Sequence, residues 1–105
     1  MIKTITIDNK TIGFKATAAT PIRYKAMFGA DLFADMAKMQ NVDPTTMEGF
    51  DITVLCQIIW ICAKAFNKDL PPLDDWFDTF DSFPLIQVFS EVMELITDSM
   101  VTEKK

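Results

Sequence analysis

The sequence is most apolar between residues 52 and 66, which read Ile52-Thr-Val-Leu-Cys-Gln-Ile-Ile-Trp-Ile-Cys-Ala-Lys-Ala-Phe66 and carry apolar side chains at 12 of 15 positions. A helix that is apolar on nearly all sides is buried among neighbouring elements. A membrane-spanning helix needs about 20 apolar residues, and this stretch is shorter and is interrupted by Gln57 and Lys64. We therefore expect a buried helix over residues 52–67 at the centre of the fold, with Asp51 as its N-cap.

Upstream of this helix, residues 2–16 have the pattern of a β-hairpin. Residues 2–7 alternate in side-chain character and are rich in β-branched residues, and a second such run follows the pair Asp8-Asn9. A turn-forming pair between two runs of this kind favours a tight hairpin. Two strands alone are barely stable in water, so we expect the hairpin to pack on helices.

Two short helices are predicted between the hairpin and the central helix. The first covers residues 20–28, with a proline near its start and Gly29 ready to end it in the left-handed conformation. Asp31 is predicted to cap the second, residues 32–39. Residues 40–49 contain proline, glycine and asparagine and are expected to form a loop.

The C-terminal third predicts two amphipathic helices. Residues 73–81 place Asp74, Asp78 and Asp81 on one side of a helix and Trp76 and Phe80 on the other. Residues 84–100 carry a broad apolar face opposite a polar one, and residues 101–105 are expected to fray.

Together these elements predict one domain over residues 1–105, with a hairpin at 2–16 and a helical part at 20–100. The fold class is mainly α with a small N-terminal β-hairpin, an α+β arrangement. About five helices surround the central apolar helix, residues 52–67.

Composition narrows the class of function. The chain has 105 residues, a net charge of −5 and no histidine. Nucleic acid and anionic membranes are unexpected partners, because both are bound through basic surfaces. The N-terminus lacks the apolar core of a signal peptide. Cys56 and Cys62 stand six residues apart, too far within one helix for a disulfide, and are expected to be free thiols in a reducing compartment.

No arrangement of residues indicates catalysis or a cofactor. The usual general base is missing with histidine, and no glycine-rich phosphate loop or zinc-type cysteine spacing is present. An aspartate cluster, Asp74, Asp75, Asp78 and Asp81, could in principle bind a divalent cation. Its helical spacing is unlike a calcium-binding loop and fits a solvated helix face better. We therefore expect a protein that is not an enzyme and has no cofactor or metal.

Large apolar side chains are abundant for so short a chain, which has nine Phe and seven Met. Such a domain has limited interior, so we expect some of these side chains on the surface, where apolar patches mark contacts with partners. The competing interpretation is simply a Phe-rich core. The candidate contact residues are Trp76, Phe77, Phe80, Met36, Met39 and Met47.

One segment resembles a known family. Phe14-Lys-Ala-Thr-Ala-Ala-Thr-Pro-Ile-Arg-Tyr-Lys-Ala-Met-Phe-Gly-Ala-Asp-Leu-Phe33 is similar to the tail assembly chaperones of long-tailed, siphovirus-type phages and prophages of Gram-positive bacteria. Later parts also fit, namely Ala63-Lys-Ala65 in an apolar helix and Leu73-Asp-Asp-Trp-Phe-Asp-Thr-Phe80 before an amphipathic helix. The resemblance covers most of residues 2–97, and the first segment is its specific part.

This resemblance implies a binding role in the cytoplasm of the bacterial host. Such chaperones bind the tape measure protein, keep it soluble and help to bring tail tube subunits to it. They are absent from the mature virion, and self-association is common among them.

Two other classes of function stay open at this point. Small mixed domains also serve as structural tail completion or head–tail joining proteins. The aspartate stripe suggests a small acidic regulator or inhibitor, although a charge of −5 over 105 residues is modest for that class.

Overall fold

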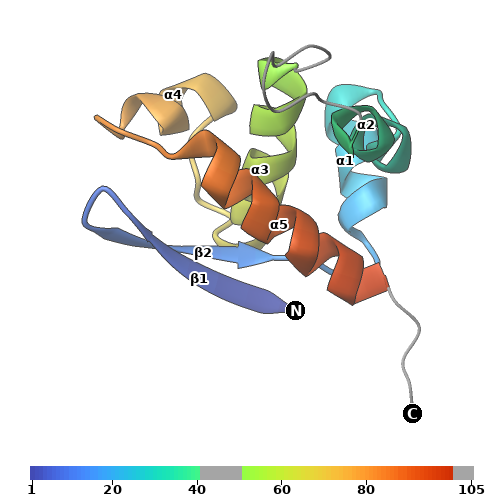
Figure 1. Ribbon diagram of the computed structural model, residues 1–105, viewed down its shortest axis with the longest axis horizontal. Helices are drawn as coiled ribbons and strands as arrows, with labels where there is room; N and C mark the ends of the chain where they lie inside the picture. The colour runs from blue at the N-terminus through green and yellow to red at the C-terminus, as the bar shows by residue number, and fades with distance from the viewer. Residues whose placement is uncertain (41–50, 101–105) are drawn as a thin grey trace.

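The computed structural model describes residues 1–40 and 51–100 (Figure 1). The elements in chain order are β1 (Ile2–Ile7), β2 (Lys10–Lys15), α1 (Thr20–Phe28), α2 (Leu32–Gln40), α3 (Ile52–Phe66), α4 (Leu73–Asp78) and α5 (Leu85–Met100). The predicted α+β class, with a two-stranded N-terminal hairpin and helices making up the rest, is confirmed. The predicted frayed tail and almost all of the predicted loop lie outside the described residues.

The hairpin forms because its turn matches the twist of the strands. β1 and β2 pair antiparallel, with Ile5 opposite Ile12. Asp8 and Asn9 both take positive φ, 53° and 64°, which is the backbone of a type I′ turn. One face of the sheet, with Ile7 and Phe14 buried, packs on the helical part.

α3 is the centre of the fold, as the sequence predicts. It packs against β2 and against each of the other four helices. Its N-terminus is capped by Asp51, whose Oδ1 accepts from the backbone N–H groups of Thr53 (3.0 Å) and Val54 (3.3 Å). Nowhere in residues 1–40 and 51–100 is there a helix with the length and apolar composition needed to cross a membrane.

α5 crosses the hairpin and closes the core from that side (Figure 1). Its inner residues Val88, Val92, Leu95 and Ile96 are buried. At the edge of this contact Lys3 of β1 lies 3.2 Å from Glu91 Oε1 and 3.4 Å from Glu94 Oε1. These ion pairs join the hairpin to the polar side of α5.

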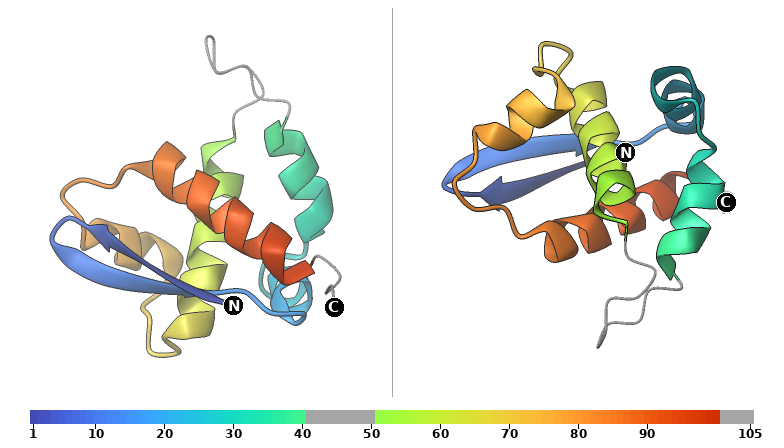
Figure 2. Two further views of the ribbon diagram at one scale, coloured as in Figure 1. Left: turned by 60° about the horizontal axis from the view of Figure 1, so that its bottom comes forward. Right: turned by 90° about the horizontal axis from the view of Figure 1, so that it is seen from above.

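The two ends of the molecule are built differently. Figure 2 shows α4 beside the hairpin turn at one end and the α1–α2 pair at the other. α1 ends at Gly29 in the left-handed conformation (φ 71°). Asp31 then caps α2, accepting from the N–H groups of Phe33 (2.9 Å) and Ala34 (3.1 Å). Both terminal signals were predicted from the sequence.

α4 is shorter than the predicted helix of residues 73–81, because it ends at Asp78. The Thr79 hydroxyl donates to the Trp76 carbonyl at 2.6 Å. The N–H groups of Thr79 and Phe80 each donate to the carbonyl three residues before them, which tightens the chain into turns. Beyond these turns the N–H of Asp81 donates to Asp8 Oδ2 in the hairpin turn, at 3.0 Å. Asp81 therefore lies outside α4 and is not part of a helical stripe with the other aspartates.

Candidate interaction surface

Most of the side chains predicted to contact a partner are buried. Trp76 is 4% exposed, Phe80 9%, Met36 8% and Met39 7%. Phe77 is half-buried and packs against the core. Met47 lies outside the described residues. The first four side chains are therefore not exposed as expected, and a role of any of these residues in partner contact stays a prediction.

The aromatic residues of α4 are buried because they pack on one another. Trp76 contacts Phe80 and Phe83 edge to face, with ring centroids 5.2 Å and 5.9 Å apart. Lys10 holds this cluster to the hairpin turn, since its Nζ lies 4.8 Å from the centre of the Phe80 ring and donates to the Thr79 carbonyl at 2.7 Å. Phe83 supplies the far wall of the cluster and was not anticipated.

The two methionines of α2 lie on its inner side. Leu32, Asp35, Met36 and Met39 are the buried residues of this helix, at the spacing of one helical face. This face meets α1 and α3. Met39 is therefore a core residue, whereas Met36 also reaches the wall of a surface hollow described below.

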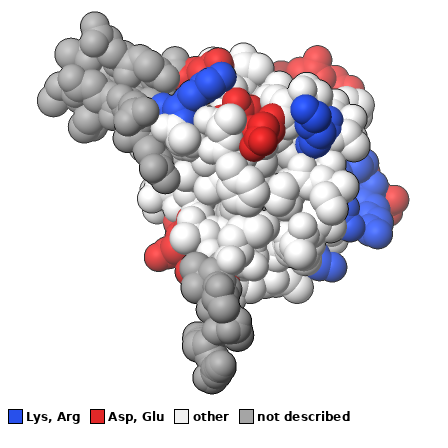
Figure 3. All heavy atoms as spheres, turned by 90° about the vertical axis from the view of Figure 1, so that its right-hand side faces the viewer, with Lys and Arg blue, Asp and Glu red and all other residues white. Residues whose placement is uncertain are grey.

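Exposed apolar side chains gather instead on the outer side of α1 and α2. Ile22 is 70% exposed and Phe33 50%, while Met27, 53% exposed, lies on the part of α1 that faces α3. On the side of the molecule that faces the viewer in Figure 3, the charged groups mostly surround a central uncharged area. The other large exposed apolar side chains are scattered over the hairpin start, the two ends of α3 and the start of α5.

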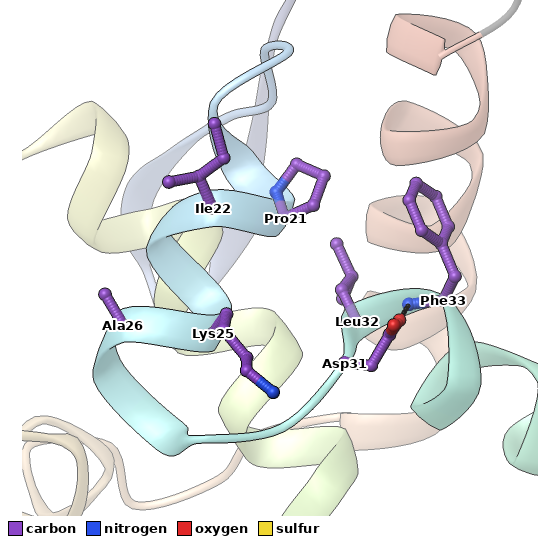
Figure 4. A pocket seen from close by; sticks show the side chains of 7 residues that line it. All are labelled: Pro21, Ile22, Lys25, Ala26, Asp31, Leu32 and Phe33. Carbon is purple, nitrogen blue, oxygen red and sulfur yellow. Dashed lines mark hydrogen bonds between the residues drawn. The ribbon is translucent and has the colours of Figure 1, made fainter.

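A hollow of about 570 Å³ lies between α1 and α2. Figure 4 shows Pro21 and Ile22 on its α1 side and Leu32 and Phe33 on its α2 side. Leu32 is buried and forms the floor, whereas Ile22 and Phe33 stand at the rim.

A second hollow of about 240 Å³ lies between α2 and α5, lined by Phe33, Met36, Ile96, Thr97 and Met100. The Phe33 side chain lines both hollows. The two hollows are therefore neighbours, and we call their main apolar lining the α1–α2–α5 face, made of Pro21, Ile22, Leu32, Phe33, Met36, Ile96 and Met100. Among the described residues lining either hollow, only Lys25 and Asp31 are charged.

A buried polar network holds the helices behind this face. The Tyr24 hydroxyl of α1 donates to Asp35 Oδ2 of α2 at 2.7 Å and lies 3.2 Å from Gln57 Oε1 of α3. Burial, followed by the neighbouring Asp35 carboxylate, raises the pKa of Tyr24 well above its usual value. The phenol therefore stays protonated and keeps three helices in fixed relative positions.

The remaining reactive groups show no catalytic arrangement within the described ranges. Burial raises the pKa of the Cys62 thiol to about 12 and also raises that of Cys56, so both thiols are poor nucleophiles at neutral pH. Asp74, Asp75 and Asp78 are exposed on α4. Across residues 1–40 and 51–100, no three potential metal ligands come together.

The α1–α2–α5 face was missed although the sequence contains a sign of it. α1 has two apolar pairs at four-residue spacing, Tyr24 with Phe28 and Ile22 with Ala26, which fall on opposite sides of the helix. A short helix with one core-facing side needs only one such pair. The second pair is the surplus that marks an exposed apolar surface.

Comparison of the chain with known protein families, curated proteins and solved structures finds no significant match. The resemblance to phage tail assembly chaperones therefore stays a prediction, and the function is argued from the surface.

Proposed function

We propose that this protein is a tail assembly chaperone of a long-tailed phage or prophage of Gram-positive bacteria. It binds the tape measure protein, keeps it soluble and helps to bring tail tube subunits to it. It works in the host cytoplasm and is absent from the finished virion. The observation that carries the proposal is the α1–α2–α5 face, which has two neighbouring apolar hollows that share Phe33.

The shape and chemistry of this face suit an apolar helical stripe. An amphipathic helix docks by placing residues one turn apart into neighbouring pockets. The two neighbouring hollows offer two such pockets, and Ile22 and Phe33 at their rim supply exposed apolar contacts. Met36 and Met100 in the smaller hollow can adjust to different side chains, because methionine is flexible and polarisable.

The overall charge supports the same role. A net charge of −5 helps a chaperone to keep an apolar partner dispersed. Because only Lys25 and Asp31 are charged among the described residues that line the two hollows, binding there leaves most charged groups in solvent.

The test is co-expression with a tape measure protein from the same genome. We expect the chaperone to raise the soluble fraction of that protein and to co-elute with it. The double variant Ile22→Asp/Phe33→Asp should abolish both effects. Both side chains are at least half exposed, so these changes spare the core. An exposed aromatic contact of this kind is typically worth about 1–2 kcal/mol or more in binding.

Ile86→Asp is the matched control. Ile86 is exposed to the same degree but lies at the opposite end of α5. It should leave solubilisation intact. If the double variant solubilises the tape measure protein as well as the unmodified chain, the face is not the binding site. Detection of the protein in purified virions by mass spectrometry would instead assign it a structural role in the tail.

A further inference from the structure

A third hollow of the molecule is lined by basic as well as apolar residues. It is a groove of about 420 Å³ between α1 and α3, which neighbours the α1–α2 hollow and shares Ala26 with it. Met27 and Ile61 contribute its apolar lining, and Met27 is half exposed. Three cations, Arg23, Lys64 and Lys68, surround this lining, and none of the residues that line the groove is acidic.

These cations are unusual in a protein with a net charge of −5. Within the described part of the chain, none of the three has a carboxylate at ion-pair distance. Lys64 Nζ donates to the carbonyls of Lys68 (2.8 Å) and Leu70 (3.0 Å), which hold its ammonium group in place without neutralising it. The groove therefore combines an apolar floor with uncompensated positive charge.

We propose that this groove is a second docking site, which binds an amphipathic helix of a partner protein whose apolar face is bordered by Asp or Glu. The apolar floor between two helices receives the partner's apolar residues, as a third helix packs into a groove. The partner's carboxylates then meet Arg23 and Lys68 at the exposed rim. Charge complementarity speeds such an encounter and selects against basic partners. This site goes beyond the proposed function and does not depend on it.

The experiment titrates the full chain with a fluorescein-labelled amphipathic peptide of about 18 residues, long enough to be helical when bound. Its apolar face is Leu and Ala and its border is Glu, and a second peptide replaces every Glu with Gln. By fluorescence anisotropy, we expect the Glu peptide to bind at least about fivefold more tightly than the Gln peptide, and the difference to shrink between about 50 and 300 mM salt.

The double variant Arg23→Gln/Lys68→Gln should remove this preference. The matched control Lys15→Gln/Lys25→Gln removes the same charge elsewhere, since Lys15 lies on β2 and Lys25 lines the α1–α2 hollow. The control should retain most of the preference. The variant Ile22→Asp/Phe33→Asp should also retain it, so failure of the proposed function and failure of this site are separable.

Methionine methyl NMR locates the bound peptide. In the chain labelled at its methionine methyl groups, the Met27 signal should shift on titration, whereas Met36 and Met100 in the other hollow should not. Equal binding of the two peptides, a shift of Met36 and Met100 without Met27, or an unchanged preference in Arg23→Gln/Lys68→Gln would overturn the proposal. The proposal would also be overturned if the unmodified chain formed a dimer that Arg23→Gln/Lys68→Gln alone dissociated. The groove would then be occupied by a second copy of the chain.

Discussion

At the scale of single residues, Gly13 shows how closely the hairpin and the central helix approach. The ring of Phe66, the last residue of α3, lies against Gly13 of β2, and a Cβ added at position 13 would collide with this ring. Gly13 has no positive φ, so its lack of a side chain serves the close contact and no special backbone conformation. The sequence alone shows a glycine inside a strand without indicating what comes near it.

Gly13→Ala is expected to lower the free energy of unfolding by about 1 kcal/mol, because the Phe66 ring must swing away from β2. The cost is limited, since Phe66 is 46% exposed and can move toward solvent. A double-mutant cycle with Phe66→Ala measures the contact by urea denaturation. In the Phe66→Ala background, Gly13→Ala should be close to neutral. An equal cost in both backgrounds would contradict this account.

At the scale of elements, the helix ends depend on local signals, which the sequence predicts well. Two helices start with an aspartate whose side chain accepts N–H groups of the first turn, Asp31 and Asp51. One helix is followed by a glycine in the left-handed conformation, Gly29. These signals operate within a few residues, so they need no tertiary information. The Asp51 cap matters most, because it starts the helix that every other helix contacts.

Asp51→Ala is expected to destabilise the protein by about 1 kcal/mol, since two N–H groups at the start of α3 lose their acceptor. The loss should appear as a lower urea midpoint with an unchanged slope. Asp51→Asn keeps a side-chain acceptor and is the matched control, expected to cost less than half as much. If the Asn variant is as unstable as the Ala variant, the charge of Asp51 is the main contribution and the hydrogen bonds are secondary.

The end of α4 marks the limit of such local reasoning. Helical periodicity continues through Asp81, yet the helix stops at Asp78, and the N–H of Asp81 bonds to Asp8, far away in the sequence. The same limit explains the buried aromatic side chains. An amphipathic pattern places Trp76 and Phe80 on one side of a helix, but only the fold shows that Phe83 covers that side.

At the scale of the whole molecule, the sequence predicts that some large apolar side chains are exposed, and some are. The exposed side chains are not the ones that were named. Met27, Phe33 and Phe66 are half exposed, so part of the Phe and Met content does reach the surface. Which residues do so depends on how the helices pack, and that arrangement follows from α3 at the centre. Composition gives the number of apolar residues, whereas the packing of the helices determines which of them are buried.

Folding of the whole chain also depends on groups that are kept protonated in the interior. The pKa of Cys62 rises from its usual 9.0 to about 12 by burial, and that of Tyr24 rises above its usual 10.0 by burial and the Asp35 carboxylate. At the surface, the pKa of Lys3 is also raised, mainly by its hydrogen bond to Glu91. In each case the folded state holds its proton more tightly than the unfolded state does. Their stabilisation is complete below the unfolded pKa and is lost as pH rises toward the folded pKa.

We therefore expect the free energy of unfolding to fall steadily from about pH 9 upward, with Cys62 alone costing about 2 kcal/mol by about pH 10.5. Urea denaturation at a series of pH values measures this profile. Cys62→Ala removes one of the ionising groups, so its profile should be flatter than that of the unmodified chain between about pH 9 and 10.5, whatever its stability at neutral pH. Tyr24→Phe should flatten the profile mainly above about pH 10, because the phenol ionises later in the unfolded chain. Parallel profiles for all three proteins would mean that alkaline unfolding is governed by general charge repulsion, with no contribution from the buried thiol and phenol.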